Sequence, residues 1–203
     1  MTNADYVLSF TAGGLLYHES IKVAETYIQS YQWDETTKKV KNENLLQSRI
    51  ASTTTRKLRE ICFRLQELTQ AQIELLVSGS RIDQNLLLWL ASCKRYQFLA
   101  EFAREVLHDK FVRLELTLHA TEVDSFMESK AVWRAEIDEL KESTRTKLIT
   151  VVMRMLRETE MLSSENLIQP QLISSQLVKA IASDSVELFS LFPVAEADVR
   201  KAI

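Results

Sequence analysis

Leu86-Leu87-Leu88-Trp89-Leu90-Ala91 is the longest unbroken apolar run in the chain. On a helix such a run is apolar on every side, which is typical of a central helix that packs on all its faces. The predicted helical region around it begins after Ser80 and extends from Arg81 to about Lys110. Because this is long for one globular helix, we expect a kink or a short break near Tyr96.

The chain contains very few residues that punctuate turns. Among its 203 residues, 3 are glycine and 2 are proline, whereas average usage predicts about 14 and about 10. Sandwiches and barrels need many tight turns, and dinucleotide or nucleotide folds need glycine-rich loops. We therefore predict an all-α fold, a compact multi-helix bundle with at most a minor β-hairpin or wing.

Hydrophobic periodicity and capping residues locate the other elements. We expect helices over residues 15–29, 44–51, 121–133, 136–141, 145–162, 174–181 and 183–193. The residues expected to cap helix starts are Asp34, the run Ser52–Thr55, Thr69, Thr121 and Ser143. Gly79 is expected to end the helix that Thr69 begins. Residues 113–118 alternate polar and apolar side chains, which indicates a strand, with a helix tail as the alternative. Residues 166–170 read as a short extended segment.

The best candidate for a domain boundary lies between Val112 and Thr121. It divides the chain into an N-terminal helical unit, residues 1–115, and a C-terminal helical unit, residues 116–203. One compact unit is the alternative, since a chain of this length forms one domain or two small ones.

The formal net charge is −3, but the charges are unevenly distributed. The basic segment, residues 38–64, has eight basic and two acidic side chains, so it carries +6 and the rest of the chain −9. Such an asymmetry indicates a polyanionic partner. The candidate DNA-binding residues of the basic segment are Lys38, Lys39, Lys41, Arg49, Arg56, Lys57 and Arg59.

The helix predicted after residues 52–55 is the most informative part of the basic segment. Its apolar side chains have the i, i+3, i+4, i+7 spacing of an amphipathic helix, and Arg56 and Arg59 fall on the opposite face. Hydroxyl, N–H and guanidinium groups at one helix start suit a phosphate backbone. A solvated charged face is the alternative. Because arginine near a helix start opposes the helix dipole, this placement is mildly unfavourable without an anion.

Two other features suit an anion. The basic stripe, defined as Lys147, Arg154 and Arg157, lies on one predicted helix face, and residues 145–157 contain four basic residues and no acidic one. We expect it to be a second DNA contact or a partner surface. Gly13 and Gly14 precede the first helix, where they form either a tight turn or a backbone cradle for an anion.

No combination of residues demands catalysis. His18, His108 and His119 are far apart in the sequence and have no metal ligand at the required spacing, and no GxSxG, HExxH or Walker sequence occurs. We therefore expect no enzymatic activity, no metal and no cofactor.

Cysteine usage and hydropathy indicate the compartment. Cys62 and Cys93 could form at most one disulfide, and no CxxC is present, so a reduced compartment is the simpler interpretation. The longest apolar run is far shorter than the ~20 residues of a membrane span, and the N-terminus lacks the features of a signal peptide. We expect a cytoplasmic protein without a membrane span.

An ordered set of short stretches resembles one protein family. These stretches are Leu8-Ser-Phe-Thr-Ala-Gly-Gly-Leu15, Glu19-Ser20, Asn44-Leu-Leu-Gln47, Glu74-Leu-Leu-Val-Ser-Gly-Ser80, Leu87-Leu-Trp-Leu-Ala91, Phe98 to Leu107, Arg154-Met-Leu-Arg157 and Phe192-Pro193. Together they are similar to the BrxA family, the small A component of BREX bacteriophage-exclusion systems. The similarity covers about residues 6–200 and includes no catalytic fingerprint.

The resemblance implies a compact helical fold like that of the antitermination factor NusB, and DNA binding without known catalysis. It also implies a role in phage defence beside a methyltransferase, an ATPase and a phosphatase-like protein. The first hypothesis is therefore a DNA-binding component that contacts the phosphates of double-stranded DNA with weak sequence preference. The alternatives are a helical adaptor that assembles the defence complex through protein contacts, and an RNA-binding protein.

Overall fold

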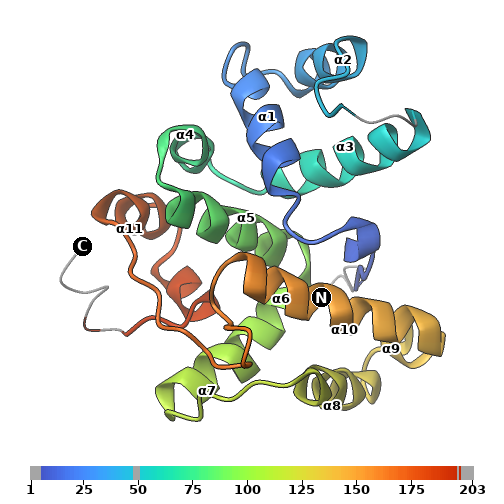
Figure 1. Cartoon of the computed structure of the whole chain (residues 1–203), viewed down its shortest axis with the longest axis vertical. Coiled ribbons are helices and arrows are strands. Elements are labelled where there is room, and N and C mark those ends of the chain that lie inside the picture. Colours follow the sequence, from blue (N-terminus) through green and yellow to red (C-terminus); the bar gives the residue numbers. More distant parts are fainter. Residues whose placement is uncertain (1–5, 48–50, 196, 198–203) are drawn as a thin grey trace.

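The computed structural model describes residues 6–47, 51–195 and 197, and over these residues the protein is built from helices (Figure 1). The α-helices are α1 (Tyr17–Tyr27), α2 (Trp33–Asn42), α3 (Ala51–Leu65), α4 (Gln70–Ser78), α5 (Arg81–Arg95), α6 (Gln97–Phe102), α7 (Asp109–Val112), α8 (Ala120–Ala131), α9 (Ala135–Asp138), α10 (Glu142–Glu158) and α11 (Ser175–Ala182). Short helices of other types are η1 (Phe10–Ala12), η2 (Ala103–His108) and η3 (Val186–Leu191). The predicted all-α class is confirmed, and a specific likeness to NusB stays a prediction.

Helix α5 is the central element, as its apolar run predicts. Residues 86–91 are all buried, and α5 packs against α1, α3, α4 and η3. The indole Nε1 of Trp89 donates a hydrogen bond to the carbonyl oxygen of Leu191 at 2.9 Å. The central helix is thereby tied to the C-terminal part of the chain.

The predicted break near Tyr96 is confirmed. Tyr96 has extended backbone angles, φ −117° and ψ 104°, between α5 and α6. Its side chain is buried, and its ring packs edge-on against Phe10 of η1, with 5.3 Å between ring centroids. The chain then continues through α6 into η2, which has π-helical geometry.

Several predicted caps form, and others do not. Thr69 caps α4 in a capping box with Gln72, and Ser80 caps α5. Asp34 is not a cap, because α2 already begins at Trp33. Thr121 and Ser143 also lie inside their helices, which begin after His119 and Lys141. At α8 the Glu122 carboxylate accepts the N–H of His119 at 2.8 Å, so an acidic residue closes this helix end instead of a hydroxyl.

Two further predictions need correction. Residues 44–47 form turns rather than a helix, because Asn44 and Gln47 have left-handed backbone angles, φ 45° and 49°. Residues 48–50 of the predicted helix lie outside the described residues.

Residues 113–118 form no strand. One isolated antiparallel bridge, Thr117 with Leu167, joins them to 166–170, and a second joins Leu162 to Ile168. The predicted wing is therefore reduced to two bridges in the described residues.

Contacts join the parts of the chain on either side of residue 115. Helix α4 packs against α11, where the Gln72 side chain donates to the carbonyl oxygen of Ala180 at 3.0 Å. Phe98 of α6 packs against Phe126 of α8, with 5.4 Å between ring centroids. The division into residues 1–115 and 116–203 stays a prediction. Within the part of the chain that the structure describes, no helix is both long and apolar enough to cross a bilayer.

We predict that Trp89→Phe lowers the free energy of unfolding by about 2–3 kcal/mol, because it shrinks a fully buried side chain and leaves the Leu191 carbonyl without its donor. Urea denaturation measures the change. The matched control is Trp133→Phe, since Trp133 is 85% exposed, and its effect should stay within about 0.5 kcal/mol. Equal losses in both variants would contradict the central position of α5.

Candidate nucleic-acid interface

The basic segment presents most of its candidate residues to solvent. Lys38, Lys39 and Lys41 are exposed on α2, and Arg56 and Arg59 are exposed on α3. Arg49 lies outside the described residues. The lysines of α2 lie toward its C-terminal end, where a positive charge also stabilises the helix dipole. Their position alone therefore does not require a ligand.

Three candidate residues of the basic segment have partners inside the protein. The Lys57 ammonium forms an ion pair with Glu19 of α1 at 2.8 Å. Burial alone would raise the pKa of Glu19, but the hydrogen bond from Lys57 is among the contacts that hold this pKa below its ordinary value. Lys39 donates to Gln29 at 2.8 Å, and the Arg59 guanidinium lies over the Phe63 ring. Three others, Lys38, Lys41 and Arg56, form no hydrogen bond or ion pair with a described residue.

The predicted hydroxyl cap before Arg56 does not form. Helix α3 already includes residues 52–55, so Arg56 lies in its second turn and not beside its free N–H groups. Serine and threonine side chains serve as caps only when the residue itself precedes the helix, where its backbone is extended. The predicted convergence of hydroxyls, N–H groups and guanidinium groups on one anion is therefore wrong for this helix.

The basic stripe lies on the exposed face of α10, as its spacing predicts. Lys147, Arg154 and Arg157 are exposed, whereas Leu148, Val151, Val152, Met155 and Leu156 are buried on the opposite face. Arg157 donates to Asn166 at 2.8 Å. Arg145, on the same helix, is bound to Asp124 and Glu128 of α8. Lys147 and Arg154 have no such partner among the described residues.

A cleft of about 510 Å³ connects the two basic regions. We call it the α1–α10 cleft, and its lining is Gly13, Gly14, Leu16, Tyr17, His18, Glu19, Lys57, Arg81, Asn85, Arg154 and Glu158. The structure thus brings Lys57 of the basic segment and Arg154 of the basic stripe to one cavity. The sequence reasoning did not select Arg81, although an arginine at a helix start is a signal that the sequence contains. It is the first residue of α5, where an arginine opposes the helix dipole unless an anion is near.

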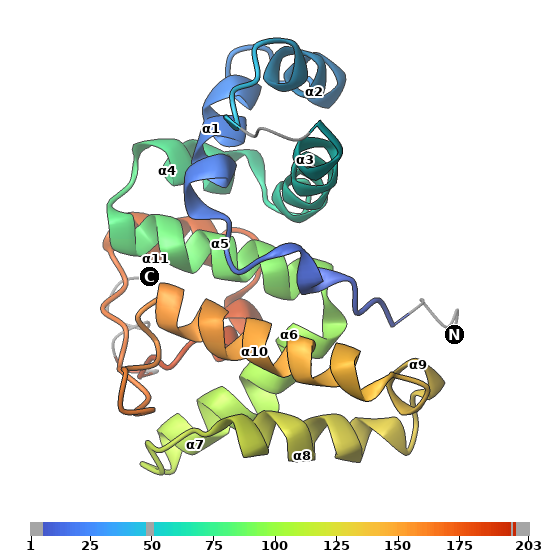
Figure 2. The ribbon, with the colours of Figure 1, turned by 45° about the vertical axis from the view of Figure 1, so that its right-hand side comes forward.

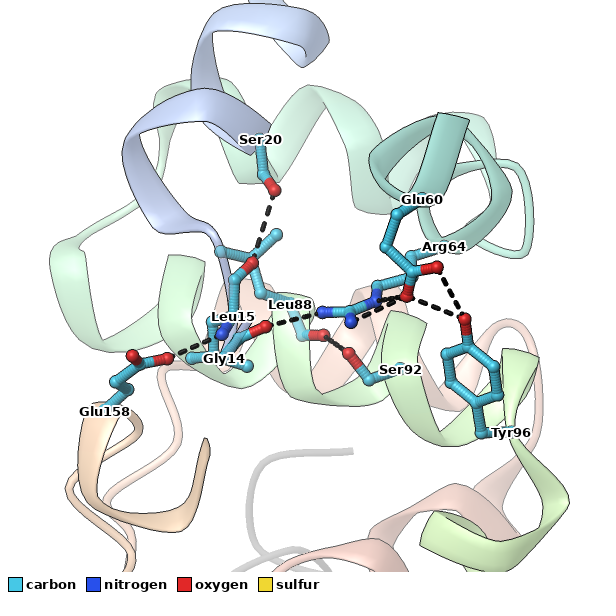
Figure 3. Close-up of polar contacts among 9 residues, drawn as sticks. All are labelled: Gly14, Leu15, Ser20, Glu60, Arg64, Leu88, Ser92, Tyr96 and Glu158. Atoms are coloured by element: carbon cyan, nitrogen blue, oxygen red, sulfur yellow. Dashed lines mark hydrogen bonds and ion pairs between the residues drawn. The ribbon is translucent and has the colours of Figure 1, made fainter. Parts of the chain in front are cut away.

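The glycine pair lines this cleft just before α1, with a bend at Gly14. Gly13 has φ 149°, a conformation that favours glycine. At Gly14 the reason is space, because a Cβ there would overlap the carboxylate of Glu158. The same carboxylate accepts the N–H of Leu15 at 2.5 Å (Figure 3). The predicted tight turn is therefore only a bend, and the Leu15 N–H is bound by the protein's own Glu158 carboxylate.

A buried charge network fixes the other side of the bend. Arg64 of α3, only 3% exposed, donates to the carbonyl oxygen of Gly14 at 2.8 Å and forms an ion pair with Glu60 at 2.7 Å (Figure 3). The Tyr96 hydroxyl donates to both oxygens of Glu60, at 2.6 and 2.8 Å. Burial and then the bond to Glu60 raise the pKa of Tyr96 to about 12. The phenol therefore stays protonated at neutral pH and remains a donor.

The N-terminal segment is consequently held between two helices that are far apart in the sequence. It runs between α3 and α10 (Figure 2), and η1 packs against both. Arg64 holds Gly14 from α3, and Glu158 holds Leu15 from α10. These two contacts set the spacing of the walls that carry Lys57 and Arg154.

Comparison with known proteins identifies both a family model and a similar structure. The BrxA family model matches residues 4–185. A crystal structure of an uncharacterized protein from Magnetospirillum magneticum has a TM-score of 0.79 at 20% identity, with 94% of this chain and 98% of that chain covered. At this identity the likeness shows a shared fold and nothing further. The comparison with curated proteins gives no match.

We predict that Arg64→Ala lowers the free energy of unfolding by about 3–5 kcal/mol, because it leaves the Glu60 carboxylate buried without its cation. Chemical denaturation measures this loss. Arg56→Ala, an exposed change on the same helix, is the matched control and should cost less than about 0.5 kcal/mol. The double variant Glu60→Met/Arg64→Met should recover part of the loss, since it removes both charges together. No recovery would mean that packing, rather than the unpaired charge, is the cause.

Proposed function

The chain belongs to the BrxA family, whose members are associated with BREX systems, and on that premise we propose that it is a non-catalytic DNA-binding component of such a phage-defence system. It contacts the phosphate backbone of double-stranded DNA through the exposed cations of α2, α3 and α10. The protein works in the cytoplasm beside the methyltransferase, the ATPase and the phosphatase-like protein of the system.

One observation carries this proposal. Acidic residues outnumber lysine and arginine in the whole chain, 28 to 25, yet several exposed cations of the basic segment and the basic stripe have no acidic partner. In the described part of the chain these are Lys38, Lys39, Lys41, Arg56, Arg59, Lys147, Arg154 and Arg157; the partners of Lys39, Arg59 and Arg157 are uncharged. Elsewhere cations are paired with acids more often: Lys94, Lys110 and Lys130 are ion-paired, although Arg104, Lys141 and Lys179 are not. A chain with excess acid that leaves these cations unpaired is well suited to an external polyanion.

The type of contact also favours phosphates over bases. Long, flexible lysines and arginines on an exposed helical surface bind phosphates, which position a protein on DNA without reading its sequence. A base-reading set of Asn, Gln and Arg side chains on one helix is not evident in the sequence. We therefore expect weak sequence preference.

The cysteines support a non-catalytic role. Cys62 and Cys93 are both buried and free. Burial raises the pKa of the Cys62 thiol to about 11, and it raises that of Cys93 as well. A nucleophilic cysteine needs a lowered pKa and access to substrate, so neither thiol is suited to covalent catalysis.

We predict that the double variant Arg56→Glu/Arg59→Glu weakens binding to a random-sequence duplex of ~30 base pairs at least tenfold, because it replaces two exposed cations with anions. For wild type, contacts by the seven candidate residues of the basic segment predict a log–log slope of binding constant against salt of roughly −6. Fluorescence anisotropy across a salt series measures both quantities.

The matched control is Arg113→Glu/Lys179→Glu, which changes the net charge equally on exposed positions of the chain outside α2, α3 and α10. This control should bind like wild type. If the Arg56→Glu/Arg59→Glu variant is folded and still binds as well as wild type, the basic segment is not the DNA contact.

The adaptor and the RNA-binding alternatives give different results in the same experiment. A protein adaptor would bind plain duplex weakly at every salt concentration and would need an acidic partner surface. An RNA-binding protein would lose the duplex to structured RNA in competition. Steep salt dependence without any partner protein, with the duplex retained against RNA, supports DNA binding.

A further inference from the structure

The α1–α10 cleft contains a buried polar side chain without a partner. Asn85 of α5 is 4% exposed, lines the cleft, and forms no hydrogen bond with any described residue. Its amide atoms are not fully buried, because the buried side-chain atoms without a hydrogen bond in the described residues are Arg64 Nη2 and Arg95 Nε, so the Asn85 amide is accessible from the cleft. The side-chain amide offers two N–H donors and an acceptor oxygen to whatever enters the cleft.

Two guanidinium groups beside Asn85 also lack a counter-ion. Arg81 lies with its Cζ 3.3 Å from the centroid of the Tyr17 ring, and Arg154 is exposed on α10; neither forms an ion pair with a described residue. Arg81 begins α5, so the positive end of that helix dipole adds to its own charge. The first turn of α1, residues 17–19, lines the same cleft and has N–H groups without a helical acceptor.

The charge balance of the lining selects the kind of anion. Lys57 is neutralised by Glu19, and Glu158 adds a negative charge beside the bend. With Arg81 and Arg154 included, the lining has a net charge of +1. A single negative charge is matched by this balance, whereas a nucleoside triphosphate would bring more negative charge than the lining can compensate.

We infer that the α1–α10 cleft binds one phosphodiester of a DNA backbone. Arg81 and Arg154 contact its charged oxygens, and the Asn85 amide donates a hydrogen bond to them. This inference rests on the proposed DNA-binding function and assigns it a defined phosphate site between the basic segment and the basic stripe.

The first test measures the salt dependence of duplex binding for Arg81→Gln and Arg154→Gln. Each variant should lower the affinity about tenfold, and the double variant Arg81→Gln/Arg154→Gln should reduce the magnitude of the log–log salt slope by about 0.9, the contribution of the one phosphate contact. Lys179→Gln, which removes an exposed cation of α11 outside the cleft, is the matched control and should change neither quantity. If wild type binds the duplex and both cleft variants match it, the phosphate site is wrong and the proposed function stands.

A second test uses a probe small enough to enter the cleft. The dinucleotide thymidylyl-(3′→5′)-thymidine has one phosphodiester, and its methylphosphonate analogue is neutral. We expect the dinucleotide at millimolar concentration to shift the NMR resonances of the Asn85 side-chain amide and the Tyr17 backbone amide in a saturable way. The neutral analogue should not. No shift with the dinucleotide overturns the inference, and tighter binding of adenosine triphosphate overturns the choice of a diester. If wild type binds no duplex, the proposed function fails, and the dinucleotide still decides whether the cleft binds a phosphodiester.

Two more variants separate binding from folding. Asn85→Leu removes an unpartnered amide, so its melting temperature should equal or exceed that of wild type while duplex affinity falls. Glu158→Gln keeps an oxygen to accept the Leu15 N–H but removes a negative charge from the cleft, so it should tighten duplex binding severalfold. A lower melting temperature for Asn85→Leu together with unchanged affinity would mean that Asn85 serves only the fold.

Discussion

The buried guanidinium of Arg64 is the constraint on which the rest of the structure depends. A charge that is 3% exposed must be paired and hydrogen-bonded, and among the described residues Glu60 and the Gly14 carbonyl supply the ion pair and the hydrogen bonds. Satisfying it fixes the N-terminal bend against α3. Tyr96, at the break between α5 and α6, completes the network through Glu60, so one charge sets the position of three elements around the central helix.

The surface charges follow a different rule from the buried ones. Inside the bundle and along most helices, cations are matched by nearby carboxylates, such as Arg145 with Asp124 or Lys130 with Glu101. On the exposed faces of α2, α3 and α10 most cations have no carboxylate partner, although the chain as a whole is acidic; among the described residues elsewhere, Arg104, Lys141 and Lys179 also lack one. The contrast is local and not a consequence of composition, which is why it supports an external anion better than the net charge does.

Local patterns predicted most of the fold but only part of the site. The sequence predicted the buried run at 86–91, the break at Tyr96 and the Thr69 cap, because each depends on residues that are close together in the chain. Helix starts at runs of serine and threonine were misplaced because any of several hydroxyls can cap, and packing decides which residue does. The meeting of Arg81, Asn85 and Arg154 in one cleft had no sequence signal, since it depends on how α5 and α10 pack. Lys57 and Arg154 were found from the charge pattern of the sequence, whereas Arg81 was not.

The contact between Leu15 and Glu158 spans 143 residues of the chain, and it has a consequence for biosynthesis. Because chains emerge from the ribosome N-terminus first, α1 and its glycine pair are made long before the helix that holds them. Such distant pairings also slow folding, since a long loop must close before the contact forms. A nascent chain that ends before α10 has the basic segment but lacks one wall of the cleft. The α1–α10 cleft is therefore complete only after α10 has been synthesised.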